Sequence, residues 1–296
     1  MPRDYTLKQL CRWCSVPVDQ LPGHPDLKTP FRLVEDSSDM GELMARELID
    51  EVSAHHAAGE PTVAIVPCGP MAWYEPFTRI VNGERVSLKN LHVYHMDECL
   101  DWQGRLLPAG HPYNFRSTME KVFYGGIDAD LAVPESQRHW LTAENVRAVA
   151  DELAGADVHI TLGGWGQDGH IAYNQARREP YSAVGVEELA ACRARIQYNN
   201  DDTLMALAQR TFGSAYQFAP PMSVTLGLAE CLSARKVRLF SDTGAWKQTA
   251  LRVGLFGPVT PEYPMTLLQR HPDAMLTATR DTADHPIAHH PEWELF

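Results

Sequence analysis

The chain has 296 residues, with 26 lysines and arginines against 38 aspartates and glutamates, so its formal net charge is −12. This acidic balance argues against nucleic acid or an anionic membrane as a partner, because both need a basic surface. No apolar run reaches the roughly 18 residues of a membrane span. No apolar leader segment is visible after Pro2-Arg3-Asp4. The six cysteines are therefore expected to be reduced thiols in a cytoplasmic protein.

The first part of the chain is predicted to be an extension over residues 1–35, with a short helix over 7–14. Three prolines then interrupt regular structure. Ser37-Ser38-Asp39, followed by Glu42, is typical of a capping box. The apolar spacing after it predicts a long amphipathic helix to about Ala58.

Two apolar strands are predicted next, each ending in polar or glycine-containing sequence. Residues 62–67 form the first strand, and Cys68-Gly69-Pro70-Met71 turns the chain into a helix that ends near Val81. A strand, a glycine loop and a helix in this order can place a phosphate at the helix N-terminus. Residues 91–96 form the second strand, which ends at Asp97-Glu98.

The middle of the chain has a weaker pattern. Residues 99–118 lack a clear period and are expected to form a loop near the site, with a helix from about Asn114 to Phe123. Another helix is predicted over 142–153, starting at Thr142-x-x-Asn145.

The stretch 163–175 is the strongest local signal in the sequence. It follows an apolar strand over 157–162, and four glycines in seven residues allow a sharp turn and close approach to a ligand. Asp168 and His170 lie two residues apart just beyond the strand's carboxyl end, where open α/β sheets bind ligands. A carboxylate beside an imidazole is a plausible proton-transfer pair. A structural turn with a capping Asp remains the alternative.

The rest of the chain continues the alternation of strands and helices. Residues 176–222 are polar and arginine-rich and are predicted to act as a lid, and 224–228 form a short apolar segment. Strands are predicted over 236–241 and 275–279, with a helix from Gly244, and the tail 283–296 is expected to be loosely held. This alternation predicts one α/β domain over 36–282 with a mainly parallel sheet.

Four segments, in order along the chain, resemble a known family. They are residues 93–98, the turn 163–175, the helix start at Lys247, and residues 267–274. Together they resemble the glucosamine-6-phosphate deaminase (isomerase) family, whose wider group includes 6-phosphogluconolactonases. The resemblance covers about residues 36–282 and implies a modified Rossmann-like three-layer α/β fold. It also implies an enzyme that opens an amino-sugar ring, moves a proton between C2 and C1, and releases ammonia to leave fructose 6-phosphate.

The resemblance assigns roles to matching positions of this chain. Asp97 corresponds to the general base that carries the proton between C2 and C1. His170 corresponds to the histidine that assists ring opening, and Asp168 to the acid that orients it. Lys247 corresponds to a phosphate-binding lysine.

The candidate binding positions lie in the predicted loops and in the lid. Arg210, or Gln209 in the neighbouring register, falls where the family's lid carries a phosphate-binding arginine. The full candidate binding set is Cys68, Gly69, Glu98, Gly164, Gly166, Arg195, Arg210 and Lys247.

The loop after the first strand departs from the family. The family's phosphate loop reads Pro-x-Gly-Gly-(Ser/Thr)-Pro, whereas this chain has Pro67-Cys68-Gly69-Pro70-Met71, without the second glycine and the hydroxyl. Pro70 also has no N–H to offer an anion. Either Arg177, Arg178 or Arg195 rebuilds the phosphate site, or the substrate carries no 6-phosphate.

Gln175 is a second departure. The family usually has Glu at this catalytic position, completing an acid–histidine–acid arrangement. An amide cannot stabilise a protonated imidazole by charge. Glu179, four residues further on, is a candidate replacement.

Three functions stay open from the sequence. The first is a deaminating isomerase of an amino sugar or sugar phosphate. The second is a sugar lactonase, which is disfavoured by the sequence His95-Met96-Asp97-Glu98-Cys99 because this resembles the deaminase side of the group. The third is a non-catalytic sugar-phosphate sensor. No cofactor and no metal are expected, because the 13 histidines show no ligand spacing. The family contains hexamers and monomers, so a homo-oligomer is possible.

Overall fold

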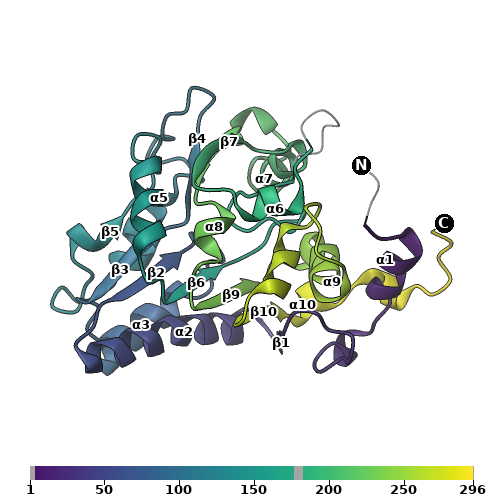
Figure 1. Ribbon diagram of the computed structural model, residues 1–296, viewed down its shortest axis with the longest axis horizontal. Coiled ribbons are helices and arrows are strands. Elements are labelled where there is room, and N and C mark those ends of the chain that lie inside the picture. Colours follow the sequence, from purple (N-terminus) through teal and green to yellow (C-terminus); the bar gives the residue numbers. More distant parts are fainter. Residues whose placement is uncertain (1–3, 177–182, 296) are drawn as a thin grey trace.

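The computed structural model describes residues 4–176 and 183–295. Its centre is a seven-stranded sheet with the strand order β1-β10-β9-β6-β2-β3-β5, and every pair in it is parallel (Figure 1). A second, three-stranded sheet has the order β4-β8-β7 and is antiparallel. The predicted α/β class with a mainly parallel sheet is therefore confirmed.

The bounds of the elements agree with most of the expected ranges to within a few residues. The strands are β1 (Phe31–Val34), β2 (Thr62–Val66), β3 (Leu91–His95), β4 (Asp97–Leu100), β5 (Arg138–His139), β6 (Ile160–Gly163), β7 (Arg195–Tyr198), β8 (Met222–Thr225), β9 (Lys236–Ser241) and β10 (Ala274–Thr279). The α-helices are α1 (Leu7–Cys14), α2 (Ser37–Ala58), α3 (Tyr74–Glu84), α4 (Phe115–Met119), α5 (Val146–Gly155), α6 (Val186–Ala190), α7 (Asp201–Phe212), α8 (Leu228–Cys231), α9 (Gln248–Phe256) and α10 (Arg280–Ala283). Shorter 3-10 turns include η5 (Gly244–Lys247) and η7 (Pro286–His289), and a π-helical turn, η2 (Glu120–Tyr124), continues α4.

The N-cap of helix α2 lies one residue before the predicted capping stretch 37–39. The Asp36 carboxylate accepts hydrogen bonds from the Ser38 and Asp39 backbone N–H groups at 2.8 and 3.0 Å, so Asp36 is the N-cap. Glu42, expected in a capping box, instead pairs with Arg79 of α3. A carboxylate one position upstream satisfies the same free N–H groups, which is why the capping-box prediction was wrong in register.

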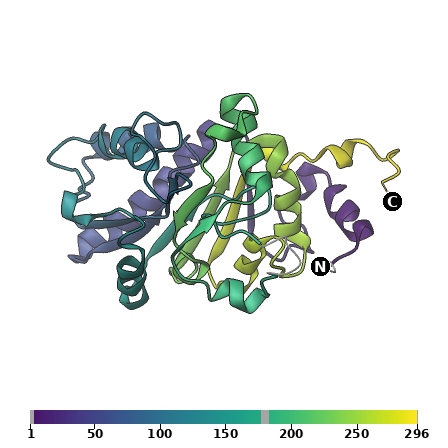
Figure 2. The same ribbon diagram turned by 90° about the horizontal axis from the view of Figure 1, so that it is seen from above.

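The central sheet is covered on both faces. Along β2, Ala64 and Val66 pack into the core beneath α2 and α3, whereas Ile65 between them packs into the core on the opposite face. This alternation follows from the two-residue period of a strand. Figures 1 and 2 show α2 and α3 along one face, with α5, α8 and α9 on the other. The result is a three-layer sandwich.

The order of the strands creates a switch point between β2 and β6. The chain builds outward from β2 through β3 to β5, and then returns to the other side of β2 with β6, β9 and β10. The loops that follow β2 and β6 therefore diverge at the carboxyl edge of the sheet. Open α/β sheets bind ligands in the crevice at such a point.

The small antiparallel sheet was not foreseen. Strand β4 starts at Asp97, where the sequence suggested only the end of a strand, and it pairs with β8. Strand β7 lies inside the segment predicted as a lid and pairs with the other edge of β8. Each of these strands has only four residues, so no period was long enough to reveal them.

The terminal segments are more closely packed than expected. Strand β1, within the predicted extension, pairs with β10 at the edge of the sheet. The fully buried Arg252 donates to the carbonyl oxygens of Val16 and Ala283 at 2.7 and 2.6 Å, joining the two ends of the chain. His285 is buried as well, so the tail is not loose at its start. In the described part of the chain, no helix combines the length and apolar character needed to cross a membrane.

Candidate active site

A cavity of about 580 Å³ opens at the carboxyl edge of the sheet, beside the switch point. It gathers six of the predicted site residues from five separate segments. They are Gly69, Asp97, Gly164, His170, Arg210 and Lys247. The remaining lining residues include Pro67, Pro70, Met71, Met96, Phe115, Trp165, Ala172, Tyr173, Asp242, Thr243, Trp246 and Asp281.

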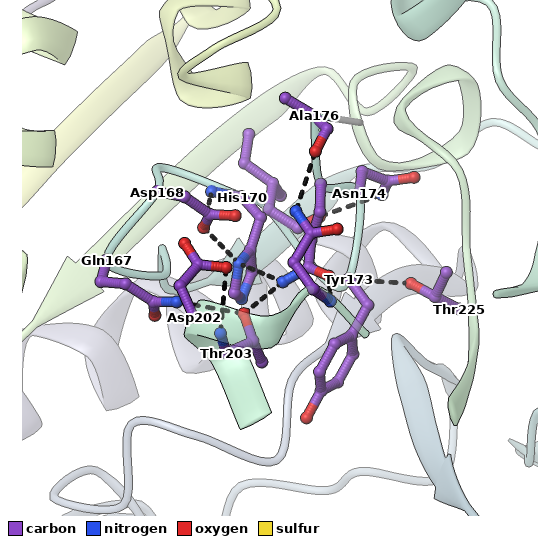
Figure 3. Close-up of polar contacts among 12 residues, drawn as sticks. Gln167, Asp168, His170, Tyr173, Asn174, Ala176, Asp202, Thr203 and Thr225 are labelled. Atoms are coloured by element: carbon purple, nitrogen blue, oxygen red, sulfur yellow. Dashed lines mark hydrogen bonds and ion pairs between the residues drawn. The ribbon is translucent and has the colours of Figure 1, made fainter. Parts of the chain in front are cut away.

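The predicted pairing of His170 with Asp168 is present. His170 Nδ1 lies 2.6 Å from Asp168 Oδ1, and the Asp168 side chain is fully buried behind the imidazole (Figure 3). A carboxylate only accepts, so Nδ1 carries the proton and Nε2 is the nitrogen left for a ligand. The ring of Tyr173 stacks on the imidazole with the two centroids 5.7 Å apart, which further fixes its orientation.

Gly166 does not line the cavity but lies directly against His170. A Cβ at this position would overlap three atoms of the His170 ring, so only glycine fits here. The Gly166 N–H donates to the His170 carbonyl oxygen at 3.0 Å, which closes the turn. Gly166 was predicted to bind substrate, and its contacts give it the role of placing His170.

Gln175 lies on the other side of the same imidazole. Its Nε2 is 3.3 Å from His170 Nδ1 and also donates to the Thr203 hydroxyl. Its Oε1 accepts the Asn200 backbone N–H at 2.8 Å. Gln167 Nε2 donates to the same Thr203 hydroxyl at 3.1 Å (Figure 3). These bonds tie the histidine turn to the start of α7.

Asp97 is half-buried at the first position of β4 and faces the cavity. Burial, and to a smaller extent the charge of Glu98, together raise the pKa of its carboxyl to about 8. Both effects favour the neutral acid. A carboxylate with a pKa near neutrality is well matched to take a proton and give it back.

Glu98 has a structural role in place of the predicted contact with substrate. Its buried carboxylate accepts the backbone N–H groups of Cys99, Phe115 and Arg116 at 2.9, 2.9 and 2.7 Å. It thus caps the start of α4 and holds the loop 101–114 to the sheet. Burial raises the pKa of the Glu98 carboxyl, and these three donors oppose the shift.

Cys68 faces a smaller space. It lines a second cavity of only about 10 Å³, together with Glu98 and His95, and Asp97 borders both cavities. Burial raises the pKa of the Cys68 thiol, so it stays protonated. The cysteine therefore adjoins the larger cavity without lining it.

Arg210 and Lys247 form the cationic end of the large cavity. Arg210 Cζ lies 4.7 Å and Lys247 Nζ 5.0 Å from the centre of the Trp246 ring, so both cations contact the same indole. Burial lowers the pKa of Lys247 to about 7, with a further contribution from Arg210. Arg210 is supplied by α7, the helix that also bonds to Gln175.

Arg195 is engaged elsewhere. Its guanidinium donates to Asn174 Oδ1 and Gln197 Oε1, both at 2.8 Å. It is not among the cavity-lining residues of the described chain. Arg177, Arg178 and Glu179, which were considered as replacements for missing family residues, lie outside the described residues.

Several cavity residues were not predicted from the sequence. Asp242, Thr243 and Trp246 follow β9, and Asp281 follows β10. Their signal was the same one that singled out Asp97, because polar residues just beyond the carboxyl end of a parallel strand meet at one edge. In the described part of the chain, no three His, Cys, Asp or Glu side chains are grouped as a metal site would need.

The chain is similar to the glucosamine-6-phosphate deaminase of Aeromonas hydrophila, being 27% identical over 249 residues that cover 82% of this chain and 87% of the relative. It is 28% identical to the corresponding deaminase of Pectobacterium carotovorum over 246 residues, which cover 81% of this chain and 86% of the relative. No family model matches the chain.

Two solved structures show the same fold. A monomeric glucosamine-6-phosphate deaminase superposes with a TM-score of 0.71 at 21% identity, covering 86% of this chain and 98% of the other. A 6-phosphogluconolactonase from Shewanella baltica has a TM-score of 0.56 at 15% identity, covering 85% of this chain and 97% of the other. The predicted resemblance to the glucosamine-6-phosphate deaminases and their wider group is therefore confirmed over most of the chain.

Proposed function

We propose that this protein is a deaminating isomerase that acts on an amino sugar, in the manner of glucosamine-6-phosphate deaminase. The named relatives support this activity across four fifths of the chain. The observation that carries the proposal is the presence of Asp97 and His170 on one cavity. Asp97 can act at the carbon atoms of the sugar, and His170 can act at its ring oxygen.

The residues of the cavity account for each proton. His170, oriented by Asp168, assists the transfer at the ring oxygen that opens the sugar to its aldehyde. The Asp97 carboxylate then removes the proton from C2, while the C1 oxygen takes a proton that the substrate's ammonium group gives up. Asp97 returns its proton to C1, which leaves a hydroxyl on C1 and an imine at C2. Water adds to the imine, ammonia leaves, and the product is a ketose.

The raised pKa of Asp97 suits this step. The group must accept a proton from a weak carbon acid and release it again at the neighbouring carbon. A carboxyl with a pKa of about 8 is a stronger base than an exposed aspartate.

The proposal is tested by measuring ammonia release from glucosamine 6-phosphate and from glucosamine, with C2 deuterium exchange in D₂O as a second readout. We expect ammonia and exchange from at least one of the two sugars. Absence of both signals from both sugars, in protein that is folded by circular dichroism, would overturn the proposal.

A sugar lactonase is the second candidate. The structural similarity to a 6-phosphogluconolactonase supports the fold on which such an activity could rest, and the Asp168–His170 pair could activate water. Hydrolysis of a sugar lactone, followed by acid release, separates the two activities. Tight sugar binding without either reaction would favour the sensor.

We also propose a cytoplasmic setting with a small-molecule sugar as partner. All six cysteines are free thiols, which suits a reducing compartment. Whether the chain assembles into a homo-oligomer is decided by light scattering.

A further inference from the structure

The end of the cavity that contains Arg210 and Lys247 also contains carboxylates. Asp242 and Asp281 both line this cavity, and Asp97 lines it as well. Because its raised pKa keeps Asp97 largely neutral near pH 7, the ionised carboxylates among the described lining residues are Asp242 and Asp281, which stand against Arg210 and Lys247. A site meant for a phosphate dianion would need an excess of positive charge or of N–H donors.

Asp242 acts directly on the cationic end. Its negative charge raises the pKa of Lys247, opposing the larger lowering by burial and by Arg210. The outcome is a pKa of about 7, so Lys247 carries only part of its charge at neutral pH. The effective positive charge is thus smaller than two cationic side chains suggest.

The Asp281 carboxylate occupies space that a side chain at position 244 would fill. Gly244 has a φ of +68°, and a Cβ on it would overlap the Asp281 carboxylate. The Gly244 N–H donates to the Thr282 hydroxyl at 3.0 Å, which holds the two loops together. The glycine therefore leaves room for the Asp281 carboxylate in the cavity lining.

The loop that follows β2 also lines the cavity and offers few side-chain donors for an anion. Gly69, Pro70 and Met71 line the cavity there, and Pro70 has no N–H. None of these residues has a hydroxyl. Helix α3 begins only at Tyr74, and the Tyr74 hydroxyl is used on the Pro67 carbonyl oxygen at 3.1 Å.

We propose that this cavity selects an amino sugar whose end remote from C1 and C2 carries a free hydroxyl group and no phosphate, with Asp242 and Asp281 as the specificity-determining residues. This inference rests on the proposed function. Ionised carboxylates accept hydrogen bonds from sugar hydroxyls and attract the substrate's ammonium group. The same carboxylates repel a phosphate monoester, which carries a charge of about −1.5 to −2 at pH 7.

The test compares kcat/KM for glucosamine and glucosamine 6-phosphate in the wild-type protein and in the Asp242→Asn, Asp281→Asn and double variants. We expect the wild type to prefer the unphosphorylated sugar. The double variant should move the ratio of the two kcat/KM values toward the phosphate by at least about tenfold, because two like charges are removed. Asp50→Asn removes an exposed carboxylate of α2 that does not line the cavity, and this control should leave the ratio unchanged.

Calorimetric binding of glucose and glucose 6-phosphate to the same proteins gives a readout that does not depend on turnover. Preference of the wild type for the phosphorylated sugar, unchanged or reduced in the double variant, would overturn the inference and leave the deaminase proposal intact. Absence of ammonia and of C2 exchange with both sugars would instead overturn the proposed function, and the inference with it. Thermal unfolding of each variant confirms that it is folded.

Discussion

The Asn200 backbone N–H donates to Gln175 Oε1 at 2.8 Å, and this bond fixes which side of the Gln175 amide faces His170. Only the oxygen can accept that N–H, so Nε2 is turned toward Thr203 and the imidazole. A donor thus occupies the place where the family usually has a carboxylate. Among the described residues, the carboxylate that bonds the imidazole is that of Asp168.

Replacing this amide by a carboxylate should restore the second acid. In Gln175→Glu one oxygen can still accept the Asn200 N–H, and the Thr203 hydroxyl can turn to donate to the other. The added negative charge favours the protonated imidazole. We expect the limb of the kcat profile that reports the imidazole to move to higher pH. Gln167→Glu is the matched control, because Gln167 bonds Thr203 without contacting His170, and its profile should not move.

A methyl group on Gly166 should disable the site. In Gly166→Ala the new Cβ overlaps the His170 ring, so the imidazole must leave its bond to Asp168. We expect turnover to fall at least about 100-fold, the usual loss on removing a positioned acid–base group. Steady-state kinetics test this. Gly110→Ala, where nothing lies near the added methyl, should keep full activity, and an active Gly166→Ala would contradict the assigned geometry.

The cap formed by Glu98 should make a measurable contribution to the free energy of unfolding. Glu98→Ala leaves three backbone N–H groups without their acceptor at a buried position. We expect the free energy of unfolding to fall by about 2–4 kcal/mol, from the loss of charged hydrogen bonds and the unsatisfied donors. Urea unfolding measures it. Glu120→Ala, which removes only an exposed partner of Arg116, should cost under about 0.5 kcal/mol, and an equal effect of the two would refute the cap.

The raised pKa of Asp97 predicts how the activity of the enzyme depends on pH. The proposed base must be ionised, so kcat/KM should rise with pH and level off above about 8. Glu98→Gln removes the smaller cause of the shift, so the rise should begin at slightly lower pH. A profile that falls from pH 6 to 8 would exclude Asp97 as the base.

The same shift has a consequence for stability. The folded protein holds the Asp97 proton from the ordinary value of 3.8 up to about 8, whereas the unfolded chain has released it, so the free energy of unfolding falls as pH rises through this window. The Asp97→Asn variant has no carboxyl at this position, so its free energy of unfolding lacks this fall with rising pH. Its Tm should therefore exceed that of the wild type by more at pH 8 than at pH 5. Equal differences at the two pH values would contradict the assignment.

The sequence was most informative where a pattern was long or chemically unusual. The period of α2, the apolar runs of β2, β3 and β9, and the turn holding Asp168 and His170 were predicted correctly, because burial and glycine geometry leave strong local marks. The capping role of Glu98 and the engagement of Arg195 with Asn174 were missed, since both depend on partners 17 and 21 residues away. Asp281 enters the cavity only because β10 lies beside β9, a relationship that spacing does not reveal.

The account depends most directly on Asp97 as the group that moves the proton between C2 and C1. The decisive measurement is deuterium exchange at C2 of the amino sugar in D₂O, followed by proton NMR, with wild type, Asp97→Asn and the control Asp50→Asn. The account predicts exchange by the wild type and by Asp50→Asn, and a loss of at least about 100-fold in Asp97→Asn, which keeps its fold and its sugar binding. Exchange by Asp97→Asn at the wild-type rate would contradict the central claim.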